Sequence, residues 1–187
     1  MKLIVGLGNF GNEYKRTRHN LGFLVIDELE KRWNLSFKEE PSAFYSTLFI
    51  NEEKIIIAKP KLFMNNSGKV IKGIANYFKV DLNDLIIFVD DKDQDMGSIK
   101  IVNKGGHGGQ NGIRNIIENF KSNDFLRVKG GIGSDKNIAT SSYVLGKWNE
   151  EQLKILPNLV SKLADIAEDF VQGKNFNELT NKYNEKK

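Results

Sequence analysis

The stretch Leu85-Ile86-Ile87-Phe88-Val89-Asp90-Asp91 decides the fold class of this chain. Its five apolar residues follow one another without a polar residue between them and end at two carboxylates. Such an unbroken run is typical of a strand that helices cover on both faces of a sheet. Open α/β sheets place their sites at the carboxyl ends of strands, so Asp90 stands where a functional side chain is expected. A cap that only ends the strand is the alternative interpretation.

Segments on both sides of this run alternate between strand and helix patterns. Leu3-Ile4-Val5 precedes a glycine turn, as a buried strand does. Residues 20–33 and 150–172 carry apolar side chains at helical spacing, and Asn20 is expected to cap the first of these helices. Further strands are predicted at residues 44–50, 54–58, 98–102 and 126–132, and further helices after Ser67, at 110–120 and at 176–183. This alternation predicts an α/β fold: a single three-layer domain of residues 1–187 with a mixed, largely parallel twisted sheet flanked by helices.

The composition bounds the chemistry and the location of the protein. The 187 residues include no cysteine, which excludes thiol catalysis, disulfides and thiolate metal sites. No apolar run is long enough to span a membrane, and the first apolar segment is too short for a signal peptide. The absence of cysteine is compatible with the cytosol, and we expect a cytoplasmic protein without membrane contact. The net charge of +4 permits a polyanionic partner without requiring one.

Gly6, Gly8 and Gly11 match the dinucleotide fingerprint G-x-G-x-x-G after a strand. A dinucleotide-binding helix begins within the glycine turn, so that its N-terminus meets the pyrophosphate. Residues 12–18 lack apolar periodicity, and the next helix is predicted only after His19. A tight turn is therefore the favoured interpretation, and a dinucleotide-binding enzyme is the alternative. The P-loop, the nucleophile elbow and helical metal-ligand spacings are missing from the sequence.

Acid–base chemistry is the remaining reaction class, and its candidates are few. The chain has two histidines, His19 and His107, and both lie in glycine-rich segments. Histidine is the usual proton carrier near neutral pH. Asn9 and Asp90 meet at one edge of the sheet if their strands are parallel, and a carboxylate there can orient an imidazole. For His107, an exposed surface loop is as good an interpretation as a site.

Asparagines and basic residues gather in the same segments. Asn65 and Asn111 carry amides that both donate and accept hydrogen bonds, which suits a peptide or nucleotide backbone. Lone asparagines are usually turn residues, so each of them alone indicates little. Basic side chains beside these motifs favour a phosphate-bearing substrate, although a charge run is usually a solvated face. These are Lys15, Arg16, Arg18, Lys59, Lys61, Lys100, Lys104, Arg127, Lys129 and Lys147.

Five segments together resemble the bacterial peptidyl-tRNA hydrolase family. Residues 6–22 match the family opening G-L-G-N-P-G-x-x-Y-x-x-T-R-H-N-x-G, and residues 59–68 match K-P-x-T-F-M-N-x-S-G. Residues 90–93 match the segment D-E/D-L-D, and residues 105–112 match the loop G-G-H-G-G-H-N-G. Residues 143–147 match a later family motif. The resemblance therefore covers nearly the whole chain.

The resemblance implies an enzyme that hydrolyses the ester between a nascent peptide and the 3′-terminal ribose of tRNA, so that tRNA is recycled from prematurely released peptidyl-tRNA. His19, Asp90 and Asn9 form the implied catalytic set, in which His19 activates water and Asp90 holds its ring. The implied substrate-binding residues are Tyr14, Phe63, Met64, Asn65 and Asn111. A monomer without metal or cofactor is expected. Ester hydrolysis needs a base for water and donors for the developing oxyanion, which is consistent with metal-free chemistry.

Four positions depart from the family pattern. Phe10 replaces a proline, so the turn after Asn9 is less fixed. Leu62 replaces a threonine, Lys92 replaces an apolar residue, and Gln110 replaces the second loop histidine but keeps its hydrogen-bonding capacity.

The family resemblance also implies a lysine and an arginine that clamp the 5′-phosphate of tRNA. The arginine position falls at Lys129 and the lysine position near Val102, with Lys100 and Lys104 close by. Because lysine lacks the bidentate fork of arginine, we expect weaker discrimination of the phosphate. An RNA-binding relative that has lost hydrolysis is a further alternative, but its expected signature, a lost histidine or asparagine, is not found.

Overall fold

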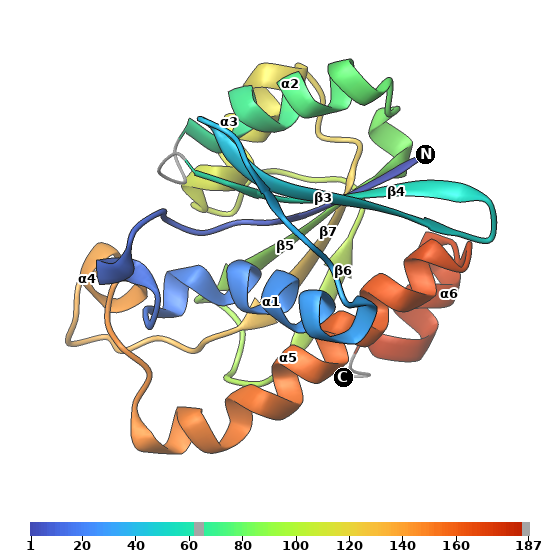
Figure 1. Cartoon of the computed structure of the whole chain (residues 1–187). Helices are drawn as coiled ribbons and strands as arrows, with labels where there is room; N and C mark the ends of the chain where they lie inside the picture. Colours follow the sequence, from blue (N-terminus) through green and yellow to red (C-terminus); the bar gives the residue numbers. More distant parts are fainter. Residues whose placement is uncertain (62–65, 185–187) are drawn as a thin grey trace.

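One mixed sheet of seven strands organises the part of the chain that the structure describes (Figure 1). The computed structural model describes residues 1–61 and 66–184. The strands are β1 (Lys2–Gly6), β2 (Lys38–Glu39), β3 (Ala43–Ile50), β4 (Glu53–Pro60), β5 (Leu85–Asp91), β6 (Ile99–Val102) and β7 (Leu126–Gly131). They lie in the order β2-β3-β4-β1-β5-β7-β6, with parallel pairing from β4 through β7 and antiparallel pairing outside it. The predicted mixed sheet is confirmed, and its parallel part is the central four strands.

Helices cover both faces of this sheet, which gives the predicted three layers (Figure 1). On one face lie α2 (Ser67–Phe78) and α3 (Asn111–Phe120). On the other lie α1 (Leu21–Trp33), α5 (Glu150–Val171) and α6 (Phe176–Tyr183). No helix within residues 1–61 and 66–184 is both long and apolar enough to cross a membrane.

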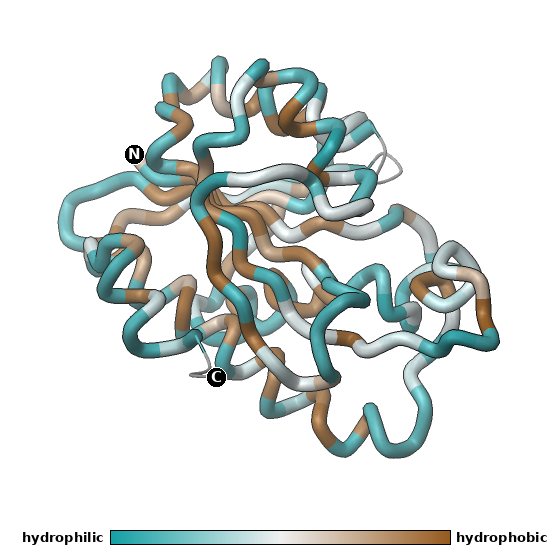
Figure 2. The backbone as a smooth tube through the Cα atoms, turned by 180° about the vertical axis from the view of Figure 1, so that it is seen from behind, coloured by the Kyte–Doolittle hydropathy of each residue, from teal (hydrophilic) through white to brown (hydrophobic). Residues whose placement is uncertain are grey.

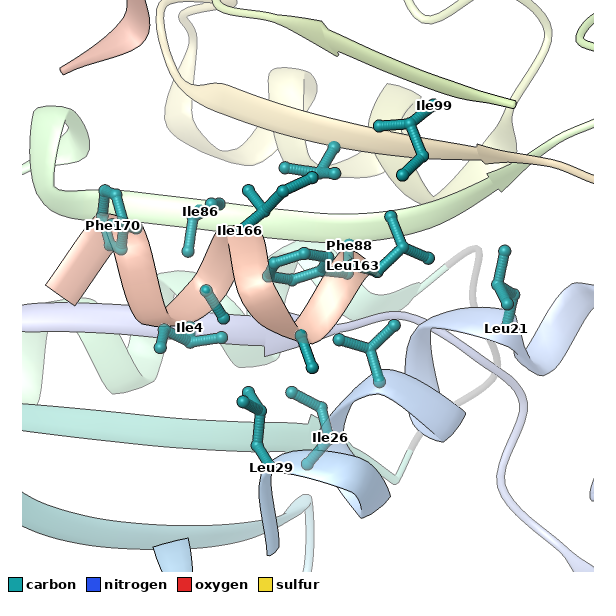
Figure 3. Close-up of a cluster of buried hydrophobic side chains, with 14 of the residues drawn as sticks. Ile4, Leu21, Ile26, Leu29, Ile86, Phe88, Ile99, Leu163, Ile166 and Phe170 are labelled. Carbon is teal, nitrogen blue, oxygen red and sulfur yellow. The ribbon is translucent and has the colours of Figure 1, made fainter. Parts of the chain in front are cut away.

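Strand β5 contributes to both hydrophobic cores, which explains its unbroken apolar sequence. Ile86 and Phe88 belong to the core under α1 and α5, and Leu85, Ile87 and Val89 belong to the core under α2 and α3. Figure 3 shows the first of these cores, with side chains from the sheet, α1 and α5. Figure 2 shows the hydrophobic strands running through the middle of the molecule. Because successive side chains of a strand point to opposite faces, a strand covered on both needs apolar residues throughout.

Most element boundaries agree with the predictions to within two residues. Among the elements of residues 1–61 and 66–184, the sequence did not predict β2, the short helix α4 (Thr140–Val144) or the 3-10 turns at Asn12–Tyr14, Arg18–Asn20 and Leu82–Asp84. Elements of this length show no periodicity in a sequence, because a pattern needs more than one repeat to be recognised. None of them changes the layers, but α4 forms part of the site described below.

Candidate active site

Two neighbouring strands end at the same edge of the sheet and bring the first site residues together. β1 and β5 pair in parallel, with Gly6 opposite Phe88. The chain leaving β1 continues this contact, because the Leu7 amide donates to the Phe88 carbonyl at 3.0 Å. Asn9 therefore lies just beyond β1, beside the end of β5 that carries Asp90. These two strands are parallel, which is the condition under which the sequence places Asn9 and Asp90 at one edge of the sheet.

His19 meets Asp90 at this edge. It lies in a 3-10 turn, Arg18–Asn20, that leads into α1. Its Nδ1 is 2.8 Å from Oδ2 of Asp90. The side chain of Asp90 is 2% exposed and that of His19 is 13% exposed, so water weakens this contact little. Because a carboxylate only accepts, it favours the imidazole tautomer with a proton on Nδ1 and leaves Nε2 for other partners.

Two opposing effects set the pKa of His19. Burial lowers the pKa, but the negative charge of Asp90 and the hydrogen bond to it raise the pKa, and the result lies above the ordinary 6.5. The pair therefore favours the protonated imidazole, the form that a general base takes once it has accepted a proton.

Asn20 occupies the N-cap position of α1, but its side chain holds the main chain of Asn9 instead of capping the helix. Its Oδ1 accepts from the Asn9 amide at 2.7 Å, and its Nδ2 donates to the Asn9 carbonyl at 3.0 Å. The prediction that its side chain caps α1 is wrong, since no capping bond forms. We call these two bonds between the Asn20 amide and the Asn9 main chain the clasp. A Cβ at Gly8 would come within 2.9 Å of Oδ1 of Asn20 and of the Phe23 ring, so this second glycine of the motif leaves room for the clasp. The glycines serve a tight turn beside a buried amide, and α1 begins only after His19.

Gln110 contacts the second oxygen of Asp90. Its Nε2 is 3.5 Å from Oδ1 of Asp90, a long and weak hydrogen bond. Its Oε1 accepts from the Ile113 amide at 2.9 Å and so caps α3. The glutamine that stands at the position of the family histidine thus connects the carboxylate to the first turn of α3, where Asn111 is the first residue.

A buried arginine holds the glycine loop before α3. Arg127, on β7, donates from Nη1 to the Gly106 carbonyl and from Nη2 to the Gly105 carbonyl, both at 2.9 Å. Burial lowers the pKa of this guanidinium. Sequence reasoning included Arg127 only among the basic residues, and no local signal marks it as a loop anchor. His107, further along the loop, is exposed, and its Nδ1 accepts from the Gly109 amide at 3.0 Å.

A cavity of about 830 Å³ opens beside the His19–Asp90 pair. Among the residues expected from the sequence, it is lined by Asn9, Tyr14, His19, Asp90, Lys100, Asn111 and Lys129. Lys104 is exposed and does not line it, whereas His107 does. The expected substrate-binding residues Phe63, Met64 and Asn65 lie outside the described residues. Sequence reasoning missed one wall, formed by Thr140, Ser141, Val144 and Leu145, of which only the last two lie in a recognised motif.

Two lysines provide positive charge on one side of the cavity. Lys100 of β6 and Lys129 of β7 are directly opposite each other in the antiparallel pair. Burial lowers the pKa of Lys129, and the nearby positive charges of Arg127 and Lys100 also lower it, against the opposing effect of Asp91 and Asp93. An anionic partner stabilises the charged form of a half-buried lysine that lies beside other cations.

The fold and the site together define an α/β protein with an acid–base pair at the carboxyl edge of its parallel strands, inside a cavity that also carries lysines. The chain belongs to the peptidyl-tRNA hydrolase family, whose model matches residues 3–187.

Known members resemble the chain over its whole length. The peptidyl-tRNA hydrolase of Pediococcus pentosaceus is 42% identical over 185 residues, covering 98% of this chain and 100% of the relative. That of Oceanobacillus iheyensis is 43% identical over 188 residues, covering 99% and 100%. The crystal structure of the peptidyl-tRNA hydrolase from Acinetobacter baumannii has a TM-score of 0.86 and 29% identity, covering 92% of this chain and 89% of that one. A nucleosidase from Helicobacter pylori, at 10% identity and a TM-score of 0.53, shares the fold alone.

Proposed function

We propose that this chain hydrolyses the ester between a peptide and the 3′-terminal ribose of tRNA, with His19 as the general base. The observation that carries the proposal is the 2.8 Å contact between Nδ1 of His19 and Oδ2 of Asp90 at the wall of the cavity. Membership of the peptidyl-tRNA hydrolase family supports the choice of substrate.

The reaction uses the two ends of the imidazole differently. Nδ1 of His19 donates to Asp90, and Nε2 accepts a proton from water as the water oxygen attacks the ester carbonyl. Asp90 stabilises the imidazolium that forms. The C–O bond to the ribose then breaks, and the proton passes from the imidazolium to the departing ribose oxygen, which becomes a hydroxyl, so that the products are a peptide with a free carboxyl group and tRNA.

Substrate is held by the other cavity residues. Asn9, Tyr14 and Asn111 line the cavity beside the catalytic pair and position the 3′ end and the peptide main chain. From the family resemblance, Phe63, Met64 and Asn65 join them. Lys129, assisted by Lys100 or Lys104, binds a terminal phosphate of the tRNA.

We further propose that residues 1–187 act as one domain, as a monomer in the cytoplasm, and return tRNA from prematurely released peptidyl-tRNA to translation. The reaction proceeds without a metal, because the imidazole supplies the base. Within residues 1–61 and 66–184, no three His, Cys, Asp or Glu side chains gather where they could hold a metal ion.

The test is incubation of the purified protein with peptidyl-tRNA, followed by measurement of deacylated tRNA. His19→Ala is expected to lower kcat on the order of 10²–10⁴-fold while tRNA binding persists. Tyr77→Ala, at a side chain 78% exposed on α2, is the control and keeps wild-type kcat. Full activity of the His19 variant would reject the proposed mechanism, and loss of wild-type activity on addition of a chelator would reject its metal-free part.

A further inference from the structure

The side chain of Arg18, the residue before His19, has its partners on other elements. Its Nε donates to Oε1 of Gln152 at 3.1 Å, and its Nη1 donates to the Tyr143 carbonyl at 2.9 Å. Its guanidinium carbon lies 4.1 Å from the centre of the Tyr143 ring. Directed donors combined with a stacked plane are features that arginine offers and lysine does not.

The main chain repeats this connection. The Arg18 amide donates to the Gly146 carbonyl at 3.0 Å, and Thr17 forms an antiparallel bridge with Lys147. A Cβ at Gly146 would lie 2.5 Å from Nη1 of Arg18, so glycine at this position makes room for the guanidinium. The turn that carries His19 is therefore joined by its backbone to the segment after α4, and by the Arg18 side chain to α4 and the first turn of α5.

The same network ends at the strand that carries Asp90. Tyr143 and Gln152 are buried, and both bond the Ile132 carbonyl, at 2.6 Å from Oη and 3.1 Å from Nε2. Nε2 of Gln152 also lies 3.0 Å from Oη of Tyr143. The Ile132 amide in turn donates to the Asp91 carbonyl at 3.0 Å. Buried networks in which each member is bonded fix the relative position of the elements that they join.

We propose that Arg18 is a positioning residue for hydrolysis, which fixes the turn carrying His19 relative to the strand end carrying Asp90. The inference rests on the proposed function. Arg18 does not line the cavity, so its effect on the reaction passes through His19. Misplacing a catalytic group by about 1 Å lowers rates by roughly 100-fold, so a network remote from the substrate has a measurable effect.

The decisive variant is Arg18→Lys, which keeps the charge and loses the directed donors and the stacked plane. We expect kcat for peptidyl-tRNA to fall roughly 10- to 100-fold. KM is expected to stay within about twofold, because the variant removes a requirement of the transition state and leaves substrate contacts in place. Both constants are measured on the full chain, with the melting temperature of each protein.

Arg32→Lys is the matched control. Arg32 likewise connects two elements, since on α1 it donates to Oδ1 of Asp165 at 2.7 Å and to Oγ of Ser161 at 2.9 Å on α5. It does not line the cavity. This variant is expected to lose thermal stability and keep kcat, which separates positioning of His19 from general loosening of helix packing.

Gly146→Ala disturbs the same contact from the other side and leaves Arg18 in the chain. Its added methyl group displaces Nη1, and we expect a fall in kcat similar to that of Arg18→Lys. If Arg18→Lys does not fold, Gly146→Ala decides the question.

Normal kcat in these folded variants would overturn the proposal, as would a raised KM with unchanged kcat, which would make Arg18 a substrate contact. An equal loss of kcat in Arg32→Lys would also overturn it. A wild-type protein without hydrolysis would instead reject the proposed function.

Discussion

Asp90 divides its two oxygens between two partners. Oδ2 contacts His19 at 2.8 Å, and Oδ1 contacts Gln110 at 3.5 Å. The shorter contact carries the electrostatic effect, because it raises the pKa of His19 against the burial that lowers it. The longer one is a weak contact that adds no titrating group, since a glutamine amide does not ionise near neutral pH.

Asp90→Asn tests this division at the level of one residue. The general base works in its neutral form, so the acid limb of the wild-type kcat/KM profile, which reports the free enzyme, follows the raised pKa of His19 and lies above its ordinary value of 6.5. In the variant the limb moves to lower pH, and kcat falls on the order of 10⁴-fold because the ring loses its orienting partner. The measurement is kcat and kcat/KM against pH for both proteins.

The pH dependence of stability tests independently whether Asp90 raises the pKa of His19. Because the folded-state pKa of His19 is raised, the stabilisation from the pair is fully present below the unfolded-state pKa and is lost as pH rises through the folded-state pKa. The wild type is therefore expected to be more stable to unfolding than Asp90→Asn. This difference in unfolding free energy is larger at the acid end of this pH window than at the basic end. An acid limb that does not move in the variant would show that Asp90 only ends its strand.

At the scale of elements, the antiparallel pairing of β6 with β7 places Lys100 opposite Lys129 on the cavity wall. Lys129→Ala is expected to raise KM for full-length peptidyl-tRNA and leave kcat unchanged, because a phosphate contact that does not touch the reacting ester adds binding alone. A short substrate that carries only the 3′ end is expected to show little effect. Steady-state kinetics on both substrates provide the measurement.

Removal of the 5′-phosphate from the substrate, combined with Lys129→Ala, tests whether the two changes remove the same contact. Removal of the phosphate is expected to produce the same rise in KM in the wild type and little further change in Lys129→Ala, because both changes remove one contact. Additive effects would show that Lys129 is not the phosphate contact.

At the scale of the whole molecule, the parallel strands carry the site and also separate the two cores. Phe88, fully buried at the centre of one core, lies two residues before Asp90. Phe88→Ala is expected to lower the unfolding free energy by about 3–5 kcal/mol through lost burial and the cavity left behind. Phe49→Ala, at a ring 70% exposed on β3, is expected to change it by less than about 0.5 kcal/mol. Urea unfolding of both variants compares them, and equal losses would contradict the assignment of the core.

Part of this structure follows from local patterns alone. The run from Leu85 to Val89 predicted a strand covered on both faces, because alternate side chains of a strand meet opposite cores. The helical spacing within residues 150–172 predicted α5 almost to its ends. These features depend on residues that are close together along the chain, so they can be predicted from the sequence.

The amino-acid sequence by itself determined the layers, the parallel strands and the family, and it singled out His19 and Asp90 as candidates. Only the tertiary structure decided their 2.8 Å contact, the clasp of Asn20 on the Asn9 main chain, and the network of Arg18 with Tyr143 and Gln152. Asn20 is the clearest case. Its amide is suited both to a helix cap and to the clasp on Asn9, and the sequence alone predicted the cap. Such contacts join residues 11 to 134 positions apart, and their partners are set by how strands and helices pack, which no local pattern encodes.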